Sequence, residues 1–332
     1  MNALPITALV PPAIQPASTL SAFAPLPADE PIFIRPSEVH SQGNCSYAAG
    51  LRRVGVRPEY ENATLLFGTS VHEAIASFLY EETSRAQLPM RFQAEFAMRT
   101  KRVVVRYSTV DDYSSLREIG TRHMELFAEW YPYAGFRPLR MRNGQPAVEV
   151  RTNVEVDPGI ILSCEPDAVF EVTKTQATTD GFVIAKPGDV VIPDWKTPRS
   201  ESSIAFAQRA IQPTLYKFNV EHDPKFGLDG RKVAAVGYVE LIKNKVPRKG
   251  SKTKGPRIIH PYLYPRSDDQ VRRALNQVRF AAWRIRNGVY FDDSKMAWNT
   301  PCDECEFAQF CLNGDTEGLI LPQGMTAEQL KI

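Results

Sequence analysis

The order of apolar segments along the chain is the feature that most constrains its fold. Amphipathic stretches with helical spacing come first, segments typical of strands follow, and further helical stretches complete the pattern. The strands are expected over residues 147–156, 159–172, 189–198 and 232–244. The helices are expected over residues 111–131, 202–222 and 268–288. This order predicts an α/β fold in which helices flank a mixed central sheet.

Two local signals refine the expected helices. Within residues 67–86, Thr69 or Ser70 can cap a helix that has one apolar face. That face contains Val71, Ile75, Phe78 and Leu79. Pro213 lies inside the helix expected over 202–222, so we expect a kink or a later helix start there.

The chain has 332 residues, of which 43% are hydrophobic, and this is enough for one large domain with a buried core. We expect that domain over residues 31–315, between a disordered tail rich in Pro and Ala at 1–30 and a second tail at 316–332. Its parts would be a helical part at 36–140, a catalytic core at 145–245, a basic loop at 243–257, and a final helix with a cysteine cluster at 267–312. No run of about 18 apolar residues occurs, so no transmembrane helix is expected.

Basic residues are unevenly distributed, although the formal net charge is only +2. Residues 243–257 carry seven Lys or Arg and no acidic residue, together with two Pro and two Gly. This composition is typical of a mobile loop, which is either a solvated surface or an arm that binds nucleic-acid phosphates by displacing counterions. The candidate phosphate contacts are Lys243, Lys245, Arg248, Lys249, Lys252, Lys254 and Arg257.

Three of the five cysteines are spaced C-x2-C-x5-C, at Cys302, Cys305 and Cys311. An odd total of cysteines and this close spacing favour a metal or iron–sulfur site over a set of disulfides. Such a site is typical of a reducing compartment, which for this chain would be the cytoplasm. Four thiolates also suit a tetrahedral Zn²⁺ ion, so zinc is the alternative to a cluster. Cys164 lies in an apolar strand and is expected to be a core residue.

Two of the predicted strands contain an acidic residue. Asp167 interrupts the segment 159–172, and Asp194 interrupts 189–198, where Lys196 follows two residues later. Side chains at i and i+2 of a strand lie on the same face, so Asp194 and Lys196 are expected to be neighbours. A surface ion pair would explain this pair alone. Two buried carboxylates are each costly and repel one another unless a divalent cation lies between them.

The order of polar residues resembles the RecB-like branch of the PD-(D/E)XK nuclease superfamily. The family pattern is a His on a helix, an Asp on a strand, D-x-K on the next strand and Q-x-x-x-Y on the following helix. In this chain the motifs are GTSVHEAI, EPDAVF, PDWKT and QPTLY, and they contain His72, Asp167, Asp194, Lys196, Gln212 and Tyr216. The resemblance extends from about Pro36 to Cys311. It implies a restriction-endonuclease-like mixed sheet flanked by helices, with a helical N-terminal insertion.

The cysteines extend this resemblance. The chain is similar to the AddB nuclease domain and to CRISPR-adaptation exonucleases, in which one cysteine before the nuclease core and three after it hold a [4Fe–4S] cluster. The matching residues are Cys45, Cys302, Cys305 and Cys311. Such a cluster would staple the two ends of the fold together. Cys164 stands where the family commonly has Gly, and a small apolar residue also fits a strand.

The resemblance also implies roles for the site residues. The ligands of Mg²⁺ or Mn²⁺ would be His72, Asp167, Asp194 and the backbone carbonyl of Trp195. Lys196 would orient or deprotonate the attacking water, or stabilise charge on the phosphate. Gln212 and Tyr216 would position the DNA backbone or the lysine. Glu165 lies two residues before Asp167 and would share its face, within reach of a supporting contact.

These features predict a metal-dependent DNA nuclease, and in particular an exonuclease acting on single strands or duplex ends. Its setting would be recombination, repair, phage DNA processing or CRISPR adaptation. A helicase or another protein of those pathways would be a partner, because the chain has no Walker-type phosphate loop of its own. Further phosphate contacts would come from Arg272, Arg273, Arg279, Arg284 and Arg286 of the last helix. The alternative is a non-catalytic adaptor that binds DNA ends on the same scaffold, and neither function involves a membrane.

Overall fold

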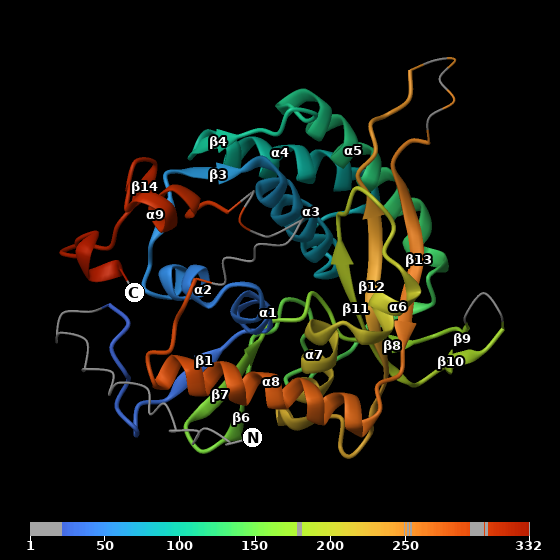
Figure 1. Cartoon of the computed structure of the whole chain (residues 1–332). Helices are drawn as coiled ribbons and strands as arrows, with labels where there is room; N and C mark the ends of the chain where they lie inside the picture. Colours follow the sequence, from blue (N-terminus) through green and yellow to red (C-terminus); the bar gives the residue numbers. More distant parts are fainter. Residues whose placement is uncertain are drawn as a thin grey trace, which may run out of the picture.

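The computed structural model describes residues 22–177, 181–248, 250, 252, 254–292, 302 and 305–331. Figure 1 shows a mixed α/β molecule in which a sheet lies between two groups of helices. This confirms the mixed α/β architecture expected from the order of apolar segments. Within the described ranges, no helix is long and apolar enough to cross a membrane.

The central sheet has five strands in the order β13-β12-β11-β8-β5. Their bounds are Phe136–Pro138 for β5, Phe170–Val172 for β8, Val190–Lys196 for β11, Val233–Ile242 for β12 and Arg257–Tyr264 for β13. β11 runs parallel to β12, whereas the other neighbouring pairs are antiparallel. The sheet is therefore mixed, and its central strand β11 carries both Asp194 and Lys196.

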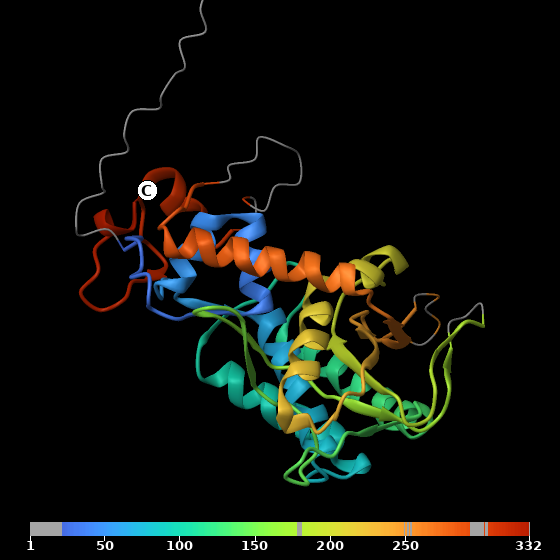
Figure 2. The same ribbon diagram turned by 90° about the horizontal axis from the view of Figure 1, so that it is seen from below.

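Helices cover both faces of this sheet (Figure 1). One group comprises α3 (Ala63–Leu79), α4 (Leu88–Lys101) and α5 (Tyr113–Trp130). The other comprises α6 (Ile204–Arg209), α7 (Ile211–His222) and α8 (Asp268–Arg286), and Figure 2 shows α8 crossing α7. Side chains alternate along β11, so that Val191 and Trp195 pack with the first group while Ile192 packs with α7 and α8.

A smaller sheet has the strand order β1-β7-β6. β1 (Ile32–Ile34) is parallel to β7 (Ile160–Cys164), and β7 pairs with β6 (Thr152–Asp157) in an antiparallel hairpin. The helices α1 (Pro36–Asn44) and α2 (Ser46–Arg53) follow β1, and α1 packs against α7 and α8. The remaining short elements are β2 (Arg57–Pro58), β3 (Tyr60–Asn62), β4 (Val104–Arg106), β9 (Gln176–Ala177), β10 (Val183–Ala185), α9 (Ala308–Asn313) and β14 (Leu319–Ile320).

The two segments expected to be tails are ordered wherever the structure describes them. Phe23 and Leu330 are buried in one apolar cluster with Tyr47 of α2. The Tyr47 hydroxyl donates a 2.8 Å hydrogen bond to the carbonyl oxygen of Leu330. Phe23 and Leu330 thus anchor parts of both segments against α2, whereas most other residues of these segments are exposed or half-buried, and the bounds of the domain stay a prediction. The rest of the first expected tail lies outside the described residues.

Two expected elements are each divided in the structure. The strand expected over 159–172 is two strands, β7 and β8, because Pro166 between them cannot donate a backbone N–H to a ladder. The helix expected over 202–222 breaks at Ala210, whose ψ of 128° is not helical. Pro213 then lies in the first turn of α7, where its missing N–H removes no helical hydrogen bond. The later start is thus the correct alternative.

α3 begins earlier than expected. Its N-cap is Asn62, whose side chain accepts a 2.8 Å hydrogen bond from the N–H of Thr64. Thr69 and Ser70 lie inside the helix, and their hydroxyls donate to the carbonyl oxygens four residues before them. Their capping role is therefore wrong, because a better cap precedes them in a segment that continues the same helix.

Candidate active site

Asp167 lies where three distant segments of the chain meet. It follows Pro166 at the end of β7, and only 6% of the residue is exposed. Its Oδ1 lies 3.0 Å from Nδ1 of His72 on α3. Its Oδ2 accepts a 2.6 Å hydrogen bond from the backbone N–H of Trp195 on β11. The carboxylate therefore joins a helix on one face of the sheet to the central strand.

Asp194 and Lys196 lie side by side on β11, as their spacing in a strand requires. Asp194 is 1% exposed, and its Oδ2 forms an ion pair with the Lys196 ammonium. The ammonium is also 5.7 Å from the centre of the Tyr238 ring on β12. Since the Lys196 side chain is 35% exposed, the cation extends from the buried carboxylate toward solvent.

Glu149 is a residue of this site that sequence reasoning missed. Residues 147–156 look like one strand, but β6 begins only at Thr152. Glu149 has a φ of 47°, and its N–H donates a 3.0 Å hydrogen bond to the carbonyl oxygen of Asp167. A left-handed backbone costs a non-glycine residue on the order of 1 kcal/mol, so the surrounding contacts must hold it. In the sequence, Glu149 alternates with apolar residues as an exposed residue of any strand does. No sequence pattern therefore marks Glu149 as a residue of the site.

Three side chains lie close enough together to share one cation. Among the residues that the structure describes, one ligand atom from each of His72, Glu149 and Asp167 lies within 4.8 Å of the others. Asp194 is not part of this group, although the charge of Asp167 contributes to the raised pKa of Asp194. Carboxylate oxygens with one imidazole nitrogen form a donor set that fits a hard divalent cation such as Mg²⁺ or Mn²⁺.

Burial and neighbouring charge shift the pKa values of these groups. Burial disfavours a charged His72, but the adjacent Asp167 carboxylate outweighs it and raises the pKa of His72 to about 9. Burial, with the charge of Asp167, raises the pKa of Glu149 to about 8. Burial also raises the pKa of Asp194 to about 6, despite the attraction of Lys196. Burial also opposes the charge of Asp167, but the attraction of His72 and Lys196 and a backbone hydrogen bond outweigh it, so the pKa of Asp167 is instead lowered. Perturbed pKa values of both signs in one cluster are typical of a functional site.

The residues of the Q-x-x-x-Y motif lie next to the two aspartates. On α7, Nε2 of Gln212 donates a 2.8 Å hydrogen bond to the Tyr216 hydroxyl. Burial and the charges of Asp194 and Asp167 raise the pKa of Tyr216, which places this hydroxyl near both carboxylates. Gln212 lines the same groove as Lys196. Residues from α3, the β7–β8 connection, β11 and α7 therefore converge on one site.

Two neighbours of Asp167 point away from this site. Cys164 is 2% exposed and packs in the apolar core between the small sheet and α7, which is the core position expected for it. Glu165 forms a 2.8 Å ion pair with Arg151, and its side chain is 41% exposed. Among the described residues, no contact between Glu165 and the residues of this site supports the role considered for it.

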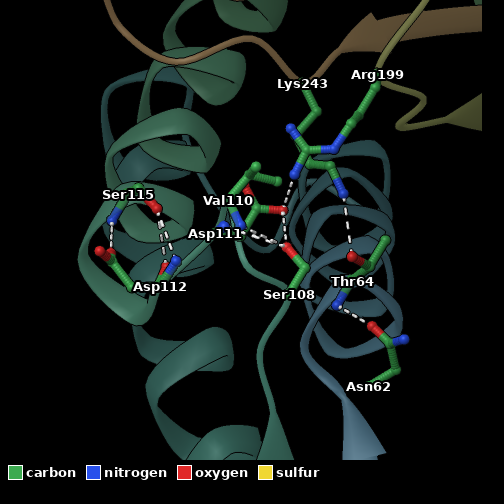
Figure 3. Close-up of polar contacts among 9 residues, drawn as sticks. All are labelled: Asn62, Thr64, Ser108, Val110, Asp111, Asp112, Ser115, Arg199 and Lys243. Atoms are coloured by element: carbon green, nitrogen blue, oxygen red, sulfur yellow. Dashed lines mark hydrogen bonds and ion pairs between the residues drawn. The ribbon is translucent and has the colours of Figure 1, made fainter.

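Lys243 does not belong to an exposed basic loop. Figure 3 shows it in a polar network beside α3 and α5, where its Nζ donates a 3.2 Å hydrogen bond to the Thr64 hydroxyl. The residue is 2% exposed, and burial lowers its pKa. Asp111 and Arg199 form an ion pair in the same network. Lys243 therefore joins the end of β12 to two helices and is not placed to contact DNA.

The rest of the basic segment connects β12 to β13. Its exposed cations among the described residues are Lys245, Arg248, Lys252 and Lys254. Arg257 begins β13 and lies 3.7 Å from the Glu201 carboxylate, so it is partly engaged. Lys249 lies outside the described residues. The exposed part of the expected arm is thus shorter than the charge pattern indicates.

The arginines of α8 are committed to contacts within the protein. Arg272 and Arg273 form ion pairs with Asp269, and Arg279 forms one with Asp157. Arg284 and Arg286 donate to the backbone carbonyls of Gln42, Pro27, Ala28 and Glu30. Arg284 and Arg286 therefore hold α8 against the N-terminal segment and are not available to DNA. Arg272 and Arg273 pair only with Asp269 of their own helix and remain 71% and 67% exposed, so the phosphate contacts expected of these two stay a prediction.

The cysteines form a second candidate site, at the corner where the C-terminal segment lies beside α2 (Figures 1 and 2). Cys45 is the N-cap of α2, and Cys302, Cys305 and Cys311 come from the segment around α9. Burial, Asp292 and the other three cysteines all raise the pKa of Cys311, so the four sulfurs are neighbours. Among the described residues no three of these sulfurs lie within 4.8 Å of one another.

Comparison with known families agrees with this geometry. A family model described as the PD-(D/E)XK nuclease superfamily matches residues 35–312, a range that contains the convergent polar residues and the four cysteines. A search of curated proteins finds no match. A mixed sheet whose central strand presents Asp194 and Lys196 beside Asp167 is consistent with this family. The chain therefore belongs to the PD-(D/E)XK nuclease superfamily.

Proposed function

We propose that this chain is a metal-dependent deoxyribonuclease that acts as an exonuclease on single-stranded DNA or duplex ends. The observation that carries the proposal is the convergence of two buried carboxylates, Asp167 and Asp194, beside the ammonium of Lys196 in a member of a nuclease superfamily. Buried carboxylates are costly for stability, and perturbed groups of this kind cluster at functional sites.

The ion-binding residues would be His72, Asp167 and Asp194, with the backbone carbonyl of Trp195. Glu149 is close enough to His72 and Asp167 to complete the same donor set. A bound Mg²⁺ or Mn²⁺ would supply an activated water and neutralise negative charge on the phosphate. The contacts of Asp167 with α3 and β11 fix its carboxylate before any ion or substrate arrives, which limits the reorganisation that binding requires.

Lys196 would act on the scissile phosphate. Burial disfavours its charge, but the carboxylates of Asp194 and Asp167 outweigh burial and raise the pKa of Lys196 above its ordinary value. A charged ammonium that reaches the groove can donate hydrogen bonds to phosphate oxygens and stabilise their charge. Gln212 and Tyr216, which are hydrogen-bonded to one another, would orient the DNA backbone on the other side of the site.

We also propose that Cys45, Cys302, Cys305 and Cys311 hold a [4Fe–4S] cluster. Their arrangement at one corner supports this, together with the C-x2-C-x5-C spacing of the last three. The cluster would tie residues near the start of the fold to its last helix and add stability by restricting the unfolded chain. Visible absorption that bleaches on reduction, with iron and no zinc in the anaerobically purified protein, is the expected result.

The substrate contacts outside the site would be made by the exposed basic segment. No acidic residue occurs near the exposed cations of this segment in the sequence, which are Lys245, Arg248, Lys252 and Lys254. Each phosphate that they contact would make DNA binding more dependent on salt. The setting would be recombination, repair, phage DNA processing or CRISPR adaptation in the cytoplasm, with a helicase or another protein of these pathways as partner. The resemblance to the AddB nuclease domain and the CRISPR-adaptation exonucleases supports this setting and this class of partner.

The direct test is degradation of labelled linear DNA in Mn²⁺ or Mg²⁺, with chelator as the blank. Asp194→Ala should abolish degradation while the protein remains folded. Glu165→Gln is the matched control, because it removes a carboxylate two residues from Asp167 that points to solvent. Undiminished cleavage by Asp194→Ala would refute the assignment.

Substrate shape separates the candidate activities. An exonuclease degrades linear single strands or blunt duplexes and leaves a single-stranded circle intact, whereas an endonuclease cuts the circle. The non-catalytic adaptor remains the second candidate, because a surface that binds DNA does not by itself require turnover. Tight binding to DNA ends with no degradation in either ion would favour that alternative.

A further inference from the structure

A groove that His72 does not line opens beside Lys196. Its volume is about 900 Å³, and it lies between α1 and α6. Lys196 and Gln212 line one part of it, and Phe206 and Tyr238 line another. The groove is thus continuous with the proposed active site.

Two aromatic rings lead outward from Lys196. The ammonium lies 5.7 Å from the centre of the Tyr238 ring, and Tyr238 in turn stacks on Phe206. The two ring centres are 5.7 Å apart with an angle of 17° between their planes. Tyr238 is buried, whereas Phe206 is 53% exposed. Phe206 therefore has one face covered by Tyr238 and substantial open surface at the groove.

The segment that carries Phe206 is held firmly. Arg266 is 6% exposed, and its guanidinium donates to the carbonyl oxygen of Ala207 at 2.5 Å and to the Thr214 hydroxyl at 2.9 Å. Gln270 of α8 donates a 3.0 Å hydrogen bond to the carbonyl oxygen of Gln208. A buried cation that holds two successive helices keeps an exposed ring in a fixed position, which is the preorganisation that a binding site needs.

We propose that Phe206 is a stacking platform for an unpaired nucleobase of the DNA strand whose phosphate lies at Lys196. This inference rests on the proposed nuclease function and names the substrate form that its site prefers. In a duplex both faces of each interior base are covered by neighbouring bases, so a single ring beside the cleavage site can stack on an unpaired base but not on a base inside a duplex. Arg209 is exposed at the same groove and places a positive charge next to the strand.

The test is a binding titration in chelator, where no cleavage occurs. Fluorescence anisotropy would compare a short labelled single-stranded oligonucleotide with the matching blunt duplex, at one fixed salt concentration. Phe206→Ala should weaken binding of the single strand about tenfold, while duplex binding changes by less than about twofold. Phe206→Leu should lose as much as Phe206→Ala, because it keeps apolar bulk but has no ring. Phe206→Trp should retain or strengthen binding.

Phe280→Ala is the matched control. Phe280 is 59% exposed and stacks on Trp283 with an angle of 11°, but it lies on α8 and does not line the groove. It should leave both affinities unchanged. Single-strand binding by Phe206→Ala equal to that of the unaltered protein would overturn the proposal, and so would an equal loss for single strand and duplex.

The outcome can be separated from that of the nuclease proposal. If Phe206→Ala binds single strands weakly but the unaltered protein degrades no DNA in Mn²⁺ or Mg²⁺, the platform stands and the nuclease fails. If degradation is normal and Phe206→Ala binds single strands as before, the platform fails and the nuclease stands. Thermal melting of each variant verifies its fold, which an exposed side chain should not alter.

Discussion

Asp194→Asn should make the metal-free protein more stable while it removes nuclease activity. Burial raises the pKa of Asp194 from 3.8 to about 6, even though Lys196 is paired with it. That rise corresponds to about 3 kcal/mol lost from the free energy of unfolding at neutral pH. Asparagine keeps the shape of the side chain without its charge. Lys196 loses part of a charged hydrogen bond in return, which costs about 1 kcal/mol, so the net gain should be about 2 kcal/mol.

The effect must depend on pH in one direction. The pKa of this carboxyl is higher in the folded than in the unfolded state, so its ionised form destabilises the fold. This cost is fully present above about pH 6 and disappears as the pH falls below the unfolded value of 3.8. The stability advantage of Asp194→Asn should therefore be largest at pH 7.5 and shrink toward pH 4.

Urea unfolding in chelator at several pH values measures both the gain and its pH dependence. Asp229→Asn is the control, since it makes the same charge change at a side chain that is 69% exposed. It should alter stability by less than about 0.5 kcal/mol. Addition of Mn²⁺ should then stabilise the unaltered protein but not Asp194→Asn. A variant that is less stable than the unaltered protein at pH 7.5, or an advantage that does not shrink in acid, would refute this reasoning.

Three further predictions concern other parts of the molecule. The affinity for Mn²⁺, measured by titration calorimetry, should rise from pH 7 to pH 9. Glu149 and His72 have pKa values of about 8 and 9, and both must release a proton before they bind the ion. Glu149→Gln should weaken this pH dependence of the affinity. Gly237→Ala should lower the free energy of unfolding by about 3 kcal/mol, as measured by urea unfolding. The added Cβ atom at this position would lie 1.7 Å from the carbonyl oxygen of Tyr262 and push β13 away from β12. Cys45→Ser should abolish the visible absorption of the proposed cluster and lower Tm, but leave Mn²⁺ binding intact.

The elements that the sequence predicted well are those whose signal is local. β11 is a continuous apolar run interrupted by Asp194, and α5 repeats its apolar residues at helical spacing, so each is recognisable without its neighbours. The convergence of His72 with Asp167 could be expected only from the family resemblance, because the two residues are 95 positions apart. Spacing in the sequence gives no distance between such segments.

The features that escaped prediction depend on contacts between distant segments. β13 follows a run of basic residues that resembles a loop, although Ile258 and Ile259 favour a strand, and its pairing with β12 shows that the sheet continues there. Lys243 has the charge of a surface residue but occupies a position at the end of β12 that α3 and α5 enclose. Glu149 takes its left-handed backbone from a hydrogen bond to Asp167, which no local pattern encodes. At Lys243 and Glu149, contacts with distant segments decide the structure and local propensity does not.

The hydrogen bond from Tyr47 to Leu330 joins residues 283 positions apart, and this separation sets an order of assembly during translation. Residues 22–53 leave the ribosome long before residues 305–331 exist, so Phe23 and Tyr47 have no covering partner for most of synthesis. The strands of the central sheet all lie before residue 265, and α8, which covers one of its faces, follows directly. A chain interrupted between α8 and residue 305 would carry the central sheet with an uncovered apolar corner, which is the kind of surface that chaperones and proteases recognise.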